Sequence, residues 1–540
     1  MEGGLALVTK TKNTYSFDSF LSQREQLNDF DNPFLVELSK RYCDQDWATF
    51  NQEMKAFSAK VSGRWRSISN EMARVENHPR LRHYDAHNHR IDQIVRTSDQ
   101  EMMEKEIFSE ALFSSQISQG EHAIKRYLIH TNGEAGVACP MACTDGLVAL
   151  LEKFQDTLSP PLQKVLQHSK EGIDGEFALG AQFMSEIQGG SNIPANVLEA
   201  IPEKEHYKLY GNKFFCSVPQ ADYSVVTARV QGTDHVGVFI VPTWLEGDKE
   251  KERRNGHEVN RLKWKLGTCE LPSSEINYQG AIAYPIGPLE KGTALAVGIV
   301  LTRSRIDIGF ATAAHMMRAA REASLYARFR EVFGRKIDEF PMAKAQIDTL
   351  VNAAKRSTAT AFKIYQDYHH VEETANVSEQ KRFDVRELIL LQKVFSSKEA
   401  VDSLRTAISI FGGHGAIEDF SSIPRIFRDA MVNELWEGPR NVLLAQVYRD
   451  LKQNAYWYPP EDFVASLLNG YDDKTIHSYG TRLKKLMKTN LYDTPNEENI
   501  VAARQWEQVL GDIFYLYQQQ ELKSYPDFAI LPQEVYDTFL

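Results

Sequence analysis

Cysteine is scarce in this sequence. The 540 residues include five, Cys43, Cys139, Cys143, Cys216 and Cys269. A small odd number is typical of a chain that keeps its thiols reduced, so we expect no disulfide framework. Cys139 and Cys143 form a single Cys-x-x-x-Cys pair with no second pair to complete a zinc site. We therefore predict no metal site.

Long apolar runs are also missing. Nowhere does the chain hold about 18 uninterrupted apolar residues, the length that a membrane-spanning helix needs. The first residues, MEGGLALVTKTKNTYSF, contain too short an apolar run for a signal peptide. The sequence therefore predicts a soluble cytoplasmic protein with no membrane partner.

Positive charge is in deficit. The formal net charge is −11, and residues 451–540 alone carry 8 Lys and Arg against 13 Asp and Glu, a net charge of −5. Nucleic-acid binding requires clustered positive charge, so this balance argues against it. The one basic cluster in this last segment is expected to be a solvated helix face; it comprises Arg482, Lys484, Lys485 and Lys488.

The order of hydrophobic patterns predicts four domains. We expect an N-terminal helical domain over 1–170, a middle antiparallel β domain over 171–290, a C-terminal helical bundle over 291–450 and an accessory helical subdomain over 451–540. The fold class is therefore mostly α with a central β domain. A histidine-rich stretch around residues 78–89 is interpreted as a polar surface loop, and a turn is expected over 133–140.

Two loops of the predicted β domain contain residues that could bind a ligand. Gly189-Gly190-Ser191 follows a predicted strand, where backbone N–H groups can form a nest for a pyrophosphate. Lys213-Phe-Phe-Cys-Ser217 places aromatic rings beside a hydroxyl, which suits a flat heteroaromatic ring. Taken alone, the first is equally well an ordinary turn and the second an ordinary β core.

Long helices return after residue 291. Ile306, Phe310, Ala313, Met317 and Ala320 recur at spacings of four and three, which predicts one apolar stripe of a bundle helix. We expect this helix to end at a glycine stop within Arg328 to Gly334. A second long helix is predicted over 378–411, ending at Gly412-Gly413, where backbone can approach a ligand or another chain.

Glu437 stands at a predicted bend. It follows the apolar pair Leu435-Trp436 and precedes Gly438-Pro439. A carboxylate at such a bend can point into a cavity, where apolar neighbours would raise its pKa and suit it to act as a base. The alternative is a solvated glutamate at the junction of a helix and a loop.

These pieces together resemble the acyl-CoA dehydrogenase superfamily, and most closely its AidB-like branch. The domain order matches, and the resemblance is strongest over about 130–450. The motifs that carry it are Met184-Ser-Glu-Ile-Gln-Gly-Gly-Ser191, Lys213-Phe-Phe-Cys-Ser217-Val-Pro-Gln220, Arg330-Glu-Val-Phe-Gly334, Phe411-Gly-Gly-His-Gly415 and Arg428-Asp to Trp436-Glu-Gly438.

The resemblance implies an FAD between the β domain and the bundle. The ring would meet Gln182, Met184 and Ser185, with Phe215 as its cover and Ser217 near N5. Ser191, in the turn with Gly190, would meet the pyrophosphate. A neighbouring subunit's FAD would be reached by Arg330, Gly412 and Gly413, which implies a homo-oligomer, usually a tetramer. Asn441 would touch the cofactor as well.

The activity implied is α,β-dehydrogenation of an acyl-CoA thioester. Glu437 matches the base that removes the α-proton, flavin N5 would accept the β-hydride, and an external acceptor such as an electron-transfer flavoprotein would reoxidise the flavin. Some relatives carry the base just before the position of Arg305, but Ser304 stands there. The alternative is a flavoprotein that mainly binds an acyl chain or a regulatory partner, with weak dehydrogenation.

Several positions depart from the family pattern. Pro439 replaces a Thr or Ser and removes both a hydroxyl and a backbone donor. Phe215 replaces a Trp, Asn192 an Asp, and Ser409 a Gln. The exchange at Phe215 keeps an aromatic ring, whereas Pro439 changes the contacts expected with FAD.

Overall fold

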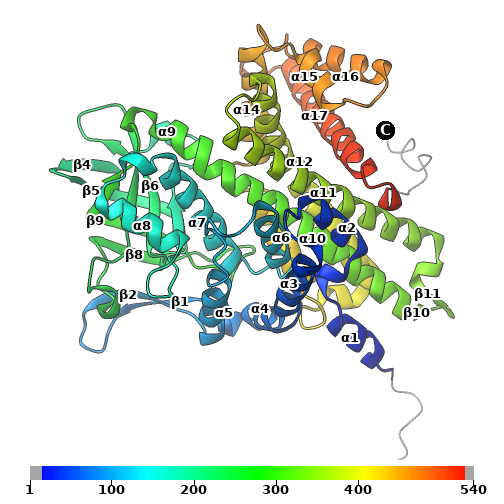
Figure 1. The fold of residues 1–540 in the computed structure, drawn as a ribbon, viewed down its shortest axis with the longest axis horizontal. Helices are drawn as coiled ribbons and strands as arrows, with labels where there is room; N and C mark the ends of the chain where they lie inside the picture. Colours follow the sequence, from blue (N-terminus) through cyan, green and yellow to red (C-terminus); the bar gives the residue numbers. More distant parts are fainter. Residues whose placement is uncertain (1–14, 530–540) are drawn as a thin grey trace, which may run out of the picture.

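The computed structural model describes residues 15–529 (Figure 1). Residues 1–14, over most of the stretch where the sequence predicts no signal peptide, lie outside the described residues. The molecule has a β-rich end, a helical bundle and a further set of helices packed on that bundle. The division into four domains stays a prediction.

The first 170 residues are mainly helical. A β-hairpin formed by β1 and β2 replaces the loop expected at the histidine-rich stretch, because Arg80 to Arg82 pair in antiparallel register with Val95 to Gln93. His83 Nδ1 also lies 2.6 Å from the buried Asp92 carboxylate. The elements are α1 (Asp18–Glu25), α2 (Pro33–Tyr42), α3 (Trp47–Lys60), α4 (Arg66–Met72), β1 (Arg80–Tyr84), β2 (Arg90–Val95), α5 (Ser98–Phe108), α6 (Gln119–His130), α7 (Ala135–Lys153) and α8 (Pro160–Lys170).

Helix α7 occupies most of the segment 133–140, where the sequence predicts a turn. The turn is confined to the residues before Ala135, Glu134 is the N-cap, and Pro140 lies inside the helix. Among residues 15–529, α7 is the helix long and apolar enough to cross a membrane, and 78% of its most apolar window is buried within the protein. It therefore packs as a core helix.

The middle region forms one seven-stranded sheet. Most neighbouring strands are antiparallel, but β3 pairs with β6 and β4 with β6 in parallel, because the chain crosses over between them. The strands are β3 (Gly180–Phe183), β4 (Glu199–Glu203), β5 (His206–Ser217), β6 (Tyr223–Val230), β7 (Val236–Pro242), β8 (His257–Leu262) and β9 (Ser273–Pro285).

The bundle is built around α10 (Thr302–Phe329), which packs against α11 (Pro341–Glu373) and α12 (Glu379–Phe411). Every residue from Ser304 to Ala320 is buried. The single apolar stripe predicted from the sequence is therefore too narrow, since the polar side of this helix also faces protein. Helix α12 begins where the Ser378 side chain accepts from Lys381 N and ends at Gly412, whose φ is +60°.

The glycine stop expected near residue 334 is a β-hairpin instead. Helix α10 ends at Phe329, and β10 (Glu331–Val332) pairs with β11 (Arg335–Lys336). Phe333 and Gly334 both have positive φ, so they form the two-residue turn between these strands. Figure 1 shows this hairpin at the end of the bundle farthest from the β sheet.

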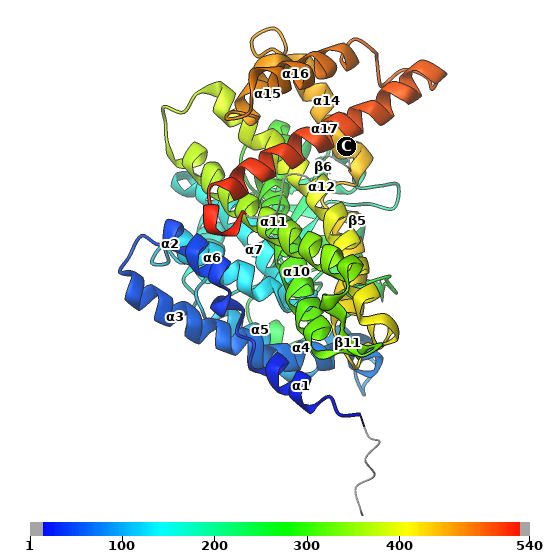
Figure 2. The same cartoon turned by 90° about the vertical axis from the view of Figure 1, so that its right-hand side faces the viewer.

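The remaining helices complete the bundle and extend it. They are α9 (Gly292–Leu295), α13 (Ile423–Asn433), α14 (Arg440–Asn454), α15 (Pro460–Leu467), α16 (Asp473–Leu486) and α17 (Glu497–Lys523). Figure 2 shows α17 lying across α11 and α12. Trp506 on α17 donates to Leu444 O at 3.1 Å, and apolar side chains of α17 belong to the same core as those of the bundle.

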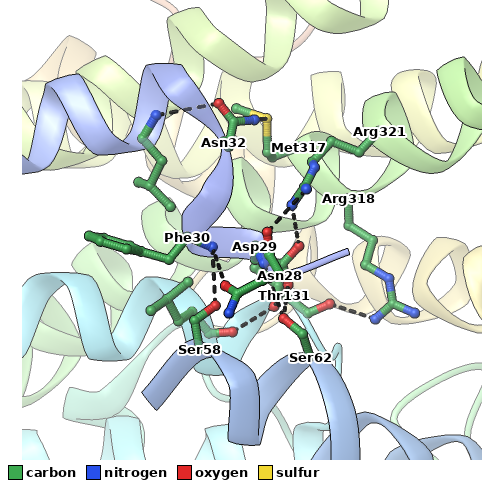
Figure 3. A network of polar contacts seen from close by, with 12 residues as sticks. Asn28, Asp29, Phe30, Asn32, Ser58, Ser62, Thr131, Met317, Arg318 and Arg321 are labelled. Carbon is green, nitrogen blue, oxygen red and sulfur yellow. Dashed lines mark hydrogen bonds and ion pairs between the residues drawn. The ribbon is translucent and has the colours of Figure 1, made fainter. Parts of the chain in front are cut away.

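A buried polar network ties the N-terminal helices to α10 (Figure 3). The Asp29 carboxylate accepts from Arg321 Nη1 at 2.7 Å and from Thr131 Oγ1 at 2.7 Å, and forms an ion pair with Arg66. Burial alone would raise the pKa of Asp29, but the two guanidiniums outweigh it and hold that pKa below its usual value. The network therefore fixes the start of the chain on the bundle.

Candidate active site

Glu437 occupies a strained turn between α13 and α14. Its φ is +59°, unusual for a residue with a side chain, and Gly438 follows with φ +104°. Arg305 Nε donates to Glu437 O at 3.0 Å, and Lys393 Nζ donates to Gly438 O at 2.6 Å and to Glu434 O at 2.9 Å. Two buried cations on neighbouring helices therefore hold the turn in this conformation.

The Glu437 side chain points toward the β domain. Gln182 Nε2 on β3 donates to its carboxylate at 2.7 Å and also lies 3.1 Å from Ser304 Oγ. Burial raises the pKa of Glu437, while Arg305, Lys393 and Gln182 lower it, and the net direction is upward. Burial also lowers the pKa of Lys393 to about 7. A carboxylate in this setting suits a base that must give its proton up again.

A cavity of about 60 Å³ adjoins this carboxylate. Gln182, Ser304, Trp436 and Glu437 line it, together with small alanines and with buried polar residues described below. Cys139 and Cys143 on α7 also line it, with their sulfur atoms 4.0 Å apart. All five cysteines of the chain are free.

The β-domain residues predicted to hold FAD lie near the same junction. Phe214 N donates to Ser185 O at 3.0 Å, which brings the ends of β3 and β5 together. A Cβ added to Gly190 would lie 2.2 Å from Ser185 Oγ and 3.1 Å from Ser185 Cβ, so a larger residue there would displace the Ser185 side chain. Ser217 Oγ lies 2.8 Å from Ser273 Oγ. Met184 differs from the rest because its side chain is buried in the hydrophobic core.

Glu186 stabilises the Gly189-Gly190-Ser191 turn, a role that the sequence analysis did not predict. The buried Glu186 carboxylate accepts from Lys213 Nζ at 2.9 Å, from Val197 N at 2.7 Å and from Leu198 N at 3.1 Å. Gly189 and Glu186 exchange backbone hydrogen bonds. These bonds hold the turn that carries Ser191 in place. The sequence signal for them is a Lys and a Glu that interrupt apolar strand patterns.

Arg330, Gly412 and Gly413 form a separate group. Arg330 follows α10 in an extended conformation, with its guanidinium 4.8 Å from the centre of the Tyr15 ring. Tyr326 OH lies 2.9 Å from His414 Nδ1, which places the end of α10 beside the two glycines. Ser304, next to Glu437, is 25 residues from Phe329, so at 1.5 Å per residue the groups are roughly 38 Å apart. They therefore lie near opposite ends of α10.

The β-domain residues fit a flat cofactor ring. Phe215 is 56% exposed, and Lys263 Nζ lies 4.8 Å from the centre of its ring. Trp436 Nε1 is buried without a hydrogen-bond partner. An open aromatic face, an unused donor and the Ser217 hydroxyl suit an isoalloxazine ring. Asn441, exposed at the start of α14, and the backbone at Pro439, which has no N–H, border the same turn.

Sequence reasoning missed Lys393 and the polar side of the cavity. The side chains of Glu134, Thr268, His315 and Asp429 come from four separate segments, and all four line the cavity with Glu437. Lys393 interrupts a run of apolar positions in α12, which was a usable signal. The convergence of the other four had no local signal in the sequence.

Comparison with known proteins identifies relatives along most of the chain. The profile of the acyl-CoA dehydrogenase C-terminal domain matches residues 290–452, and that of the adaptive response protein AidB N-terminal domain matches residues 22–170. The chain is 27% identical to acyl-CoA dehydrogenase family member 11 of Caenorhabditis elegans over 443 residues, 78% of this chain and 70% of that protein. It is 29% identical to AidB of Escherichia coli strain K12 over 376 residues, 67% and 66% of the two lengths.

Solved structures share the fold. The apo form of Bd2924 superposes with a TM-score of 0.81 at 24% identity, covering 92% of this chain and 98% of that one. The Caenorhabditis elegans protein ACDH-11, solved in complex with C11-CoA, superposes with a TM-score of 0.77 at 22% identity, covering 93% and 89%. Both alignments include the N-terminal and C-terminal helical regions as well as the bundle.

Proposed function

Because the chain belongs to the acyl-CoA dehydrogenase superfamily of oxidoreductases, in its AidB-like branch, we propose that it dehydrogenates an acyl-CoA thioester between the α and β carbons. The observation that carries the proposal is the position of Glu437. Its carboxylate stands at a held turn, with a raised pKa, beside a cavity at the junction of β domain and bundle.

Glu437 is the base in this proposal. The α-proton of a thioester is weakly acidic, so the carboxylate must be held against it and must be free of competing hydrogen-bond donors except Gln182. The backbone N–H of Glu437 would donate to the thioester oxygen, where negative charge develops. Ser304 accepts a hydrogen bond from Gln182, and its hydroxyl is too weak a base to replace Glu437.

FAD would be held by the two groups of residues described above, and when bound it supplies the acceptor for the β-hydride. Gln182, Ser185, Gly190, Ser191, Phe215 and Ser217, with the backbone of Met184 and with Asn441, would hold it from one subunit. Arg330, at the end of α10, and Gly412 and Gly413, at the end of α12, stand too far from Glu437 to reach the same cofactor from that subunit. A second copy would have to supply them, so the proposal includes a homo-oligomer, expected to be a tetramer.

The test is spectroscopic. Purified protein is loaded with FAD, and an acyl-CoA panel is added without oxygen. Loss of the flavin absorption band within seconds supports the enzyme, and addition of an electron-transfer flavoprotein should restore the band. Perturbation of the band without its loss would favour a flavoprotein that mainly binds an acyl chain or a partner. Failure of the protein to bind FAD would contradict both the dehydrogenase and the binding flavoprotein.

A cytoplasmic location belongs to the same proposal. The buried position of α7 agrees with it, because that helix is part of the core. Nucleic acid is not proposed as a partner, since the acidic balance of the chain disfavours phosphate contacts.

A further inference from the structure

The cavity beside Glu437 has a polar wall that removal of an α-proton does not require. This polar wall consists of Glu134, Thr268, His315 and Asp429, which are 3%, 2%, 4% and 4% exposed. Each side chain has an atom buried without a hydrogen-bond partner: Glu134 Oε2, Thr268 Oγ1, His315 Nδ1 and Asp429 Oδ2. Leaving buried polar atoms unpaired costs free energy, so four of them on one cavity indicate a missing partner.

Three carboxyl groups gather at this wall. Glu270, 2% exposed, accepts from Ala135 N at 2.9 Å and interacts electrostatically with Glu134 and Asp429, so three carboxyl groups share one region. Burial and this repulsion raise the pKa of Glu134 and of Asp429. The nearest guanidinium, that of Arg425, is 3.8 Å from Asp429 Oδ2.

Arg425 and the other cations near the wall also bond to groups outside it. Arg425 Nη2 donates to Asn132 O at 2.9 Å, and its other amino group donates to Gly133 O. Lys265 Nζ donates to Leu271 O at 2.8 Å and to Ser273 Oγ at 2.9 Å. Arg428 pairs with Glu418. The charge of the wall is therefore only partly offset by the protein.

A metal ion does not fit as the missing partner. Within residues 15–529 no group of three or more His, Cys, Asp or Glu side chains is arranged to hold one. The unpartnered atoms are instead all able to accept a hydrogen bond, because burial lowers the pKa of His315 to about 3 and leaves its ring neutral. An organic ammonium has three donors, no acceptor and a positive charge, which matches this wall.

The size of the cavity limits the ligand. A volume of about 60 Å³ holds roughly five water-sized groups at about 12 Å³ each. An acyl group of about that many heavy atoms would extend from Glu437 to the polar wall. A long fatty acyl chain would require the cavity to open further.

We propose that the acyl group bound here is short and ends in a protonated amine, which donates to Glu134, Thr268 and Asp429. The proposal deepens the proposed function and rests on it for the thioester end of the ligand. An acyl chain ending in a methyl group would leave the four wall atoms unpaired, whereas the ammonium donates to three of them and its positive charge favours the carboxylate form of Glu134 and Asp429.

Binding of non-reactive thioethers tests this. S-(4-aminobutyl)-CoA, S-(4-hydroxybutyl)-CoA and S-pentyl-CoA have chains of equal length and differ in the end group. Calorimetry on the FAD-loaded protein at pH 7 should show the amine binding at least ten times more tightly than the pentyl ligand. Equal or tighter binding of the pentyl ligand would overturn the proposal, and equal binding of the hydroxyl ligand would overturn the charge assignment.

Two variants locate the effect. Thr268→Val and Asp429→Asn should each reduce the preference for the amine to within about threefold and leave the affinity for S-pentyl-CoA unchanged. Glu418→Gln, which removes a carboxylate paired with Arg428 outside the cavity lining, should keep the preference. If Asp429→Asn does not fold by circular dichroism, Thr268→Val decides, and an unchanged preference in it refutes the proposal.

Failure here is distinguishable from failure of the dehydrogenase. Flavin bleaching by butyryl-CoA reports the chemistry whatever the end-group preference. Bleaching without preference for the amine would refute the ammonium site alone. Preference for the amine without bleaching by any thioester would support the site and refute dehydrogenation.

Discussion

Replacing Glu437 by glutamine removes the proposed base and keeps its shape. The substituted amide oxygen still accepts from Gln182, which now lies 2.7 Å from the carboxylate, and the backbone bond from Arg305 to Glu437 O is untouched. We therefore expect the strained turn and FAD binding to survive. The loss should fall on proton removal alone.

The magnitude follows from the role of a positioned base. General base catalysis contributes about 10²–10⁴-fold, which is about 3–5 kcal/mol at 1.36 kcal/mol per tenfold. Replacement of this carboxylate belongs at the upper end, because Ser304 offers no base, Glu134 and Asp429 lie on the polar wall of the cavity, and Asp307 is paired with Arg126 and His130. Glu437→Gln should slow flavin bleaching at least 10³-fold.

Anaerobic stopped-flow absorbance at the flavin band measures this directly. Glu434→Gln, which removes a carboxylate three residues earlier on the same turn but outside the cavity lining, is the matched control and should bleach within about threefold of the unsubstituted protein. If Glu437→Gln bleaches within tenfold of the unsubstituted protein while binding FAD and thioester equally, Glu437 is not the base.

Three further perturbations have defined outcomes. Lys393→Met removes a charge that lowers the pKa of Glu437, so the pH at which bleaching reaches half its maximal rate should rise by about one unit, with Lys393→Arg restoring it; an unmoved profile would contradict the coupling. Asp29→Asn leaves Arg66 and Arg321 unpaired and should cost about 3–5 kcal/mol in urea unfolding at pH 7. Because the folded pKa of Asp29 is lowered, the native stabilisation is present above the ordinary Asp pKa of about 4 and lost as pH falls below it, so the difference between variant and native protein should shrink at low pH. Gly190→Ala places a Cβ 2.2 Å from Ser185 Oγ and should weaken FAD binding about tenfold in a fluorescence titration, whereas Gly63→Ala, with open space around its Cβ, should not.

The sequence by itself determined the elements whose signals are local. The 33-residue helix α12 lies within the predicted range 378–411 and ends at a glycine as predicted, and β6 spans the predicted residues 223–230. Such features depend on side chains hydrogen-bonding within a few residues and on alternation along one strand, so they are readable from the chain alone. The order of several motifs along the chain likewise indicates the superfamily, because it depends on no tertiary contact.

Tertiary structure determined the features that depend on contacts between residues far apart in the sequence. Pro140 lies inside α7 because the surrounding core stabilises a helix that local propensity would end, and α10 is buried on every side because other elements cover its polar face. Gln182 meets Glu437 across 255 residues, and the polar wall gathers side chains from positions 134 to 429. Neither periodicity nor spacing encodes such convergence, because these contacts follow from how strands, turns and helices pack once each has formed.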